Sequence, residues 1–110
     1  MPRYITFFSY TGEAAKAMIE KPSDRSAAAK ALIESLGGTQ EAIYWMQGKH
    51  DGFLIANLPD GVAAAALAAA VGASGAVGGL ETHQIFDRAE QSAIVKHAAT
   101  ARKAYKPPTA

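Results

Sequence analysis

Two adjacent residues of this chain, His50 and Asp51, could support acid–base chemistry. A carboxylate beside an imidazole can orient the ring for proton transfer. The alternative is a turn, in which Asp51 hydrogen-bonds the local backbone and His50 is solvated. Adjacent residues of an extended segment point in opposite directions, which favours the turn. His50 and Asp51 are therefore candidate catalytic residues whose role depends on the tertiary structure.

His83 is the third candidate catalytic residue. Glu81 precedes it by two positions, so both side chains lie on one face of a strand. Such a pair could contribute to a metal site, with a third ligand from His50, Asp51 or His97. The spacing matches no metal signature, and a half-buried histidine with satisfied hydrogen bonds is the commoner case. We therefore expect neither a metal nor a cofactor.

Four strand aromatics could line a pocket for a small apolar or aromatic ligand. These ligand-pocket candidates are Tyr4, Tyr10, Tyr44 and Trp45. The alternative is that they fill a core or a dimer interface, as aromatic residues usually do. That alternative is favoured, although one residue can serve both purposes.

The elements that must position these residues follow from the hydrophobic pattern. Short runs of aromatic and β-branched residues predict strands near residues 3–10, 40–47, 52–58 and 79–86. Helical spacing predicts helices over 12–37, 60–71 and 87–105, with a break at Pro22 in the first of them. This β-α-β-β-α-β order with a C-terminal helix is typical of an α+β, ferredoxin-like fold with a four-stranded antiparallel sheet. We predict one domain over residues 1–106 and a frayed tail over 107–110.

Composition excludes several function classes. The net charge of +1, from 11 basic and 10 acidic residues, is too small for a nucleic-acid binder. No cysteine is present, which excludes disulfides, thiolate metal sites and cysteine catalysis. The longest apolar run, residues 62–71, is far shorter than the ~20 residues of a membrane helix, and no signal-peptide segment opens the chain. We expect no nucleic-acid or membrane partner and a cytoplasmic location.

The first predicted strand is apolar on both faces, which predicts self-association. Ile5 and Phe7 lie on one face, and Tyr4, Phe8 and Tyr10 on the other. The long helices of this fold cover one face only, and monomers rarely expose a large apolar patch. A two-fold partner would cover the second face, and the C-terminal helix is the alternative cover. We expect a homodimer or a higher homo-oligomer.

Several short segments match a known family in order and spacing. They are Tyr4-Ile5-Thr6, Leu36-Gly37-Gly38, Tyr44-Trp45, Gly48-Lys49-His50-Asp51, Pro59-Asp60 and Glu81-Thr82. On these segments the chain resembles the GYD domain family, from Tyr4 to about Ile94. One position departs from the family pattern, because His50 stands where the Gly-x-Tyr-Asp motif has its tyrosine.

The resemblance implies a ferredoxin-like fold with two sheets packed face to face, a dimeric α/β barrel, and it implies no established activity. Some relatives by fold are monooxygenases or isomerases that need neither a metal nor an organic cofactor, which is an analogy from fold alone. Two functions stay open. One is a homo-oligomeric ligand-binding or interaction module, and the other is a cofactor-independent enzyme for a small aromatic or apolar molecule. The enzyme requires two of His50, Asp51 and His83 to converge in a concave pocket.

Overall fold

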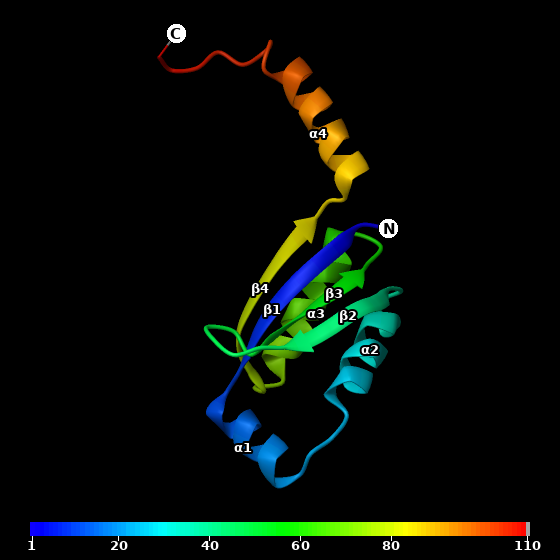
Figure 1. The fold of residues 1–110 in the computed structure, drawn as a ribbon, viewed down its shortest axis with the longest axis vertical. Coiled ribbons are helices and arrows are strands. Elements are labelled where there is room, and N and C mark those ends of the chain that lie inside the picture. Colours follow the sequence, from blue (N-terminus) through cyan, green and yellow to red (C-terminus); the bar gives the residue numbers. More distant parts are fainter. Residues whose placement is uncertain (110) are drawn as a thin grey trace.

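A computed structural model describes residues 1–109 of the chain (Figure 1). Its elements are β1 (Arg3–Tyr10), α1 (Gly12–Glu20), α2 (Arg25–Ser35), β2 (Thr39–Trp45), β3 (Gly52–Asn57), α3 (Gly61–Ala73), β4 (Val77–Ile85) and α4 (Arg88–Ala101). The α+β class and the four strands predicted from the sequence are confirmed. The predicted tail, 107–110, ends at a residue outside the described range.

The four strands form one antiparallel sheet in the order β2-β3-β1-β4. Helices α2 and α3 lie on the same face of this sheet (Figure 1). Strand order and helix placement are consistent with the ferredoxin-like fold. The two central strands, β1 and β3, carry the main core.

The hydrophobic core lies between the sheet and these two helices. Alternate residues of β1, Tyr4, Thr6 and Phe8, are buried, as strand geometry requires when one face is covered. The buried apolar residues of the core are Tyr4, Ile33, Leu54, Ala56, Leu58, Ala64 and Leu67. The face of β1 with Tyr4 and Phe8 therefore packs under the helices, and the face with Ile5 and Phe7 does not.

The first helical segment is broken at Pro22, as predicted. Helix α1 ends at Glu20 and α2 begins at Arg25. Proline lacks a backbone N–H and disfavours helix in the residue before it. Asp24 then caps α2, because its Oδ1 accepts a hydrogen bond from the Ala27 N–H at 3.0 Å.

Strand β4 begins earlier than the sequence predicted. Val77 already pairs with Tyr10, through an irregularity in register between Ser9 and Tyr10. This irregularity allows residues 77 and 78, which precede the predicted strand 79–86, to join the strand. The loop between α3 and β4 is correspondingly shorter.

Helix α4 leaves the end of β4 and extends away from the sheet, covering neither face (Figure 1). A capping box starts it, in which Asp87 and Glu90 accept each other's backbone N–H groups. Its side chains are exposed along its whole length. The helix ends at Ala101 rather than near Tyr105, because the N–H groups of Lys103 and Ala104 bond to carbonyls three residues back instead of four.

Candidate functional site

The sheet face opposite α2 and α3 carries no helix, and we call it the open face. Residues directly opposite each other on paired strands share a face, so the register defines its members. They are Arg3, Ile5, Phe7 and Ser9 of β1, Thr39, Ala42 and Tyr44 of β2, Phe53, Ile55 and Asn57 of β3, and Glu81, His83 and Ile85 of β4. Its centre, on β1 and β3, is apolar, and its polar residues lie at the strand ends and along β4.

Aromatic rings hold the middle of the open face together. The Phe7 ring lies 6.0 Å from that of Phe53 and 5.3 Å from that of His50, centroid to centroid. Tyr44 extends the cluster, with its ring 5.7 Å from Phe53. These separations are within the range of favourable aromatic pairs. The predicted pocket residue Tyr44 therefore belongs to an exposed aromatic surface, with 61% of its area open to solvent.

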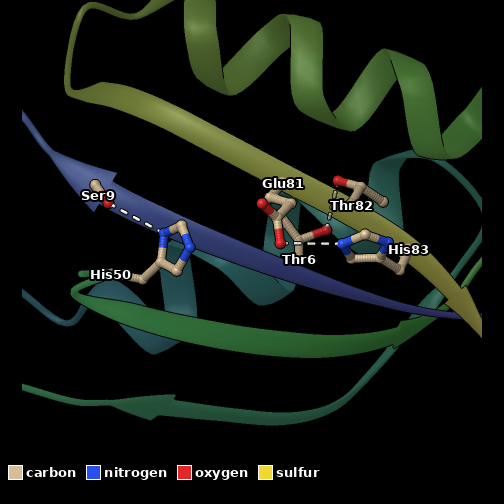
Figure 2. Close-up of polar contacts among 6 residues, drawn as sticks. All are labelled: Thr6, Ser9, His50, Glu81, Thr82 and His83. Carbon is tan, nitrogen blue, oxygen red and sulfur yellow. Dashed lines mark hydrogen bonds and ion pairs between the residues drawn. The ribbon is translucent and has the colours of Figure 1, made fainter. Parts of the chain in front are cut away.

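Two polar contacts lie on the open face, one beside β1 and one on β4 (Figure 2). His50 Nδ1 lies 3.3 Å from Ser9 Oγ. His83 Nε2 lies 3.0 Å from Glu81 Oε2, and its N–H donates because an ionised carboxylate only accepts. The structure thus brings His50 and His83, two of the predicted catalytic candidates, to one face but onto separate partners.

Glu81 is the group whose ionisation this arrangement changes. The hydrogen bond from His83 lowers the pKa of Glu81 below its usual value of 4.5. Desolvation opposes this shift, and the charges of His83, His50 and Lys49 reinforce it. His50 is therefore close enough to Glu81 to act on it electrostatically. The carboxylate lies at the surface, so this shift reflects surface electrostatics.

Asp51, the remaining catalytic candidate, has a structural partner. Its Oδ2 accepts a hydrogen bond from the backbone N–H of Tyr10 at 2.7 Å. Its own N–H donates to the Phe8 carbonyl, and its carbonyl accepts from the Met46 N–H. These bonds fasten the β2–β3 connection to the end of β1. The side chain points to the β1 backbone while His50 contacts Ser9, so the two adjacent residues do not act as a pair.

A metal site was considered around Glu81 and His83. Within residues 1–109, no group of three or more His, Asp or Glu side chains is arranged so that it could hold a metal ion. The pair on β4 therefore has no third protein ligand within one copy of the chain.

A cavity of about 120 Å³ lies on the other side of the sheet, between it and helices α2 and α3. We call it the helix-side cavity. Its walls are mainly apolar and include Phe8, Ala29, Leu32, Leu54, Leu67 and Val71. Ala28 and Ala68 line it together with Ala29. The short side chains of these three alanines leave space that larger residues would fill.

Two polar residues of the helix-side cavity are Tyr10 and Arg25. The Trp45 indole N–H donates to the Tyr10 hydroxyl oxygen at 3.1 Å. Because the Tyr10 oxygen serves as the acceptor there, its own hydrogen remains to be donated elsewhere. Tyr10 and Trp45, two predicted pocket residues, are thus placed together beside the cavity.

A second cavity, of about 230 Å³, lies beside α1, and we call it the α1 cavity. Tyr10 and Arg25 line it as well, so these two residues border both cavities. Lys21 and Ser23, from the segment between α1 and α2, add further polar groups. The residues on either side of Pro22 therefore form part of this concave surface.

Tyr4, the last predicted pocket residue, lies in the core with 7% of its area exposed and lines neither cavity. Arg25 was not predicted from the sequence as a site residue. A signal for it was present, because alanines at positions 28 and 29 give it no carboxylate three or four residues later. Ser9 was also missed, since only the folded sheet brings it to His50.

No helix in the described part of the chain has the length and apolar character needed to cross a membrane.

The fold and the two surfaces define a small α+β protein of ferredoxin-like type, and the sequence comparison identifies its family. The GYD domain family matches residues 4–95. The chain therefore belongs to the GYD domain family, as the resemblance predicted. No curated protein is similar enough in sequence to be matched to it.

Proposed function

We propose that this GYD-domain protein is a homodimeric binding module for a small apolar ligand. Two copies pack their open faces together around a two-fold axis, and each copy holds its ligand in the helix-side cavity. The observation that carries the proposal is the uncovered apolar centre of the sheet, because a face built from Ile5, Phe7, Phe53 and Ile55 is costly to leave in water.

The composition of the open face supports a protein partner of the same kind. Stable interfaces have an apolar, aromatic centre and a polar rim. The central strands supply the first, and Ser9 near the end of β1, with Glu81 and His83 of β4, supplies part of the second. A self-complementary face needs no other protein, and isologous dimers are the commonest oligomers.

The size of the open face supports a contribution from α4. Strands about 4.8 Å apart that rise about 3.3 Å per residue give a face of roughly 20 by 26 Å. Two such faces bury about 1,000 Å², which is just below the range of stable complexes. Helix α4 would add the rest by packing on the partner through Ile94 and Val95, which are exposed in one copy.

The two sheet faces then have separate tasks. The interface uses the open face, so dimerisation leaves the helix-side cavity accessible from between α2 and α3. The enzymatic alternative is not favoured, because His50 and His83 lie on the open face and Asp51 is bonded to the β1 backbone. The cytoplasmic location expected from the sequence is part of this proposal.

Light scattering coupled to size exclusion tests the dimer at micromolar concentration. We expect a mass of twice the 11.5 kDa chain. The variant Ile55→Lys should give monomers, because it places a charge in the centre of the interface. Ile19→Lys, the same change at a residue of α1 that is 81% exposed, should remain dimeric. A monomeric wild-type chain would overturn the dimer.

A further inference from the structure

The charge around the two cavities indicates what kind of ligand they take. Arg25 lines both cavities, and Lys21 lines the α1 cavity. No aspartate or glutamate among residues 1–109 lines either one. A ligand that spans their junction would meet apolar walls at one end and two cations at the other.

We propose that the two cavities form one binding site for a small monocarboxylate. Its apolar body, a single ring or a short branched chain, occupies the helix-side cavity, and its carboxylate lies at the junction formed by Tyr10 and Arg25. This inference rests on the proposed function, since it names the ligand class of the same cavity.

Arg25 is available to such a ligand. On the same helix, Lys30 already pairs with Glu34 at 3.9 Å. No carboxylate of residues 1–109 forms an ion pair with Arg25. A guanidinium presents a planar fork of donors that matches the two oxygens of a carboxylate. An arginine left without a protein partner at the edge of an apolar cavity therefore suits an anionic headgroup.

Tyr10 supplies a second donor at the same place. Its hydroxyl oxygen accepts from Trp45, which directs the hydroxyl hydrogen to another acceptor. Lys21 contributes positive charge from the α1 side of the junction. Tyr10, Lys21 and Arg25 all present hydrogen-bond donors. They favour a ligand group that only accepts hydrogen bonds, as an ionised carboxylate does.

The volume of the helix-side cavity sets the size of the apolar body. An apolar cavity of about 150 Å³ in another protein binds benzene. The helix-side cavity, at about 120 Å³, is of similar size. Benzoate is therefore a suitable probe, and nitrobenzene is its neutral counterpart of the same shape.

The test is a titration of the ¹⁵N-labelled full chain with each probe, followed by amide chemical shifts. We expect benzoate to shift amides of α2, α3 and the start of β4, and to bind more tightly than nitrobenzene. Arg25→Gln should weaken the binding of benzoate by about two- to ten-fold and leave the binding of nitrobenzene unchanged, because only the ion pair is lost. Lys30→Gln, on the same helix but outside the cavities, should change neither. Added salt should weaken benzoate alone.

The outcomes separate this inference from the proposed function. The proposal of a carboxylate ligand would be overturned if nitrobenzene binds in the cavity as tightly as benzoate, or if Arg25→Gln does not change benzoate binding. Either result would leave the proposal of an apolar ligand in place. If neither probe shifts the cavity amides, both the carboxylate and the ligand-binding part of the proposed function are overturned. Arg25 is exposed, so the variant should fold, and its dispersed amide spectrum will verify that.

Discussion

The Asp51 carboxylate accepts a hydrogen bond from the backbone N–H of Tyr10 at 2.7 Å, although 41 positions separate the two residues. This bond joins the connection before β3 to the end of β1. It also holds the backbone of Tyr10, a residue that borders both cavities. The acidic residue of the family motif therefore has an architectural role in this chain.

Replacing Asp51 should destabilise the protein. Asp51→Ala leaves the Tyr10 N–H without its charged acceptor, and we expect a loss of about 1–3 kcal/mol in the free energy of unfolding. Asp51→Asn keeps an acceptor oxygen without the charge and should lose about half as much. Urea unfolding followed by circular dichroism measures both. Equal stability of Asp51→Ala and wild type would contradict this role.

The Glu81–His83 pair should make stability depend on pH. The pKa of Glu81 is lower in the folded chain than its usual 4.5, so the contribution is present above about pH 4.5 and is lost as the pH falls through the folded value. His83→Gln should raise the pKa of Glu81 towards 4.5, measured by an NMR titration of its carboxyl carbon. His97→Gln, at an exposed position of α4, serves as the control. An unchanged titration in His83→Gln would show that the pair does not set this pKa.

Gly38 allows β2 to start against the end of β3. A Cβ there would lie 2.3 Å from the Asn57 carbonyl oxygen and 2.8 Å from a Leu58 methyl carbon. We therefore expect Gly38→Ala to lower the free energy of unfolding by about 1–3 kcal/mol. Gly72→Ala is the matched control, since no atom outside its immediate surroundings lies within 4 Å. In helix α3 it should stabilise by up to about 1 kcal/mol.

The bond between Trp45 and Tyr10 offers a spectroscopic check. Trp45 is the single tryptophan of the chain. Tyr10→Phe removes the acceptor of the Trp45 indole N–H. This change should shift the fluorescence emission of Trp45 to longer wavelength and lower the free energy of unfolding by about 0.5–1.5 kcal/mol. Tyr105→Phe, at a residue that is 65% exposed, should change neither quantity. Identical emission of Tyr10→Phe and wild type would mean that this bond does not form in solution.

The prediction of the elements from sequence succeeded where local signals were strong. Pro22 breaks the first helical segment, and Asp24, Asp60 and Asp87 each cap the helix that follows. Boundaries differed where pairing decided them, as for Val77, which joins β4 only because Tyr10 lies opposite. Local hydrogen bonding thus explains the successes, and long-range register explains the differences.

The candidate site was only partly predictable for the same reason. Tyr10 and Trp45 do meet beside a cavity, whereas Tyr4 lies in the core and Tyr44 on the open face. Arg25 was missed because the lack of a carboxylate at positions 28 and 29 does not by itself indicate a binding role. Its significance depends on what the fold places beside it.

The sequence by itself determined the order and type of the elements and the family, because helix caps, turns and apolar periodicity act over a few residues. Only the tertiary structure decided which face of β1 packs under the helices. Both faces carry apolar side chains, so periodicity alone allowed either Tyr4 and Phe8 or Ile5 and Phe7 inside. It likewise decided that α4 leaves the open face uncovered and that Tyr10 and Arg25 share a cavity. These relationships depend on packing between residues that are far apart in the chain. No single local segment includes both partners of such a contact, so local patterns do not reveal it.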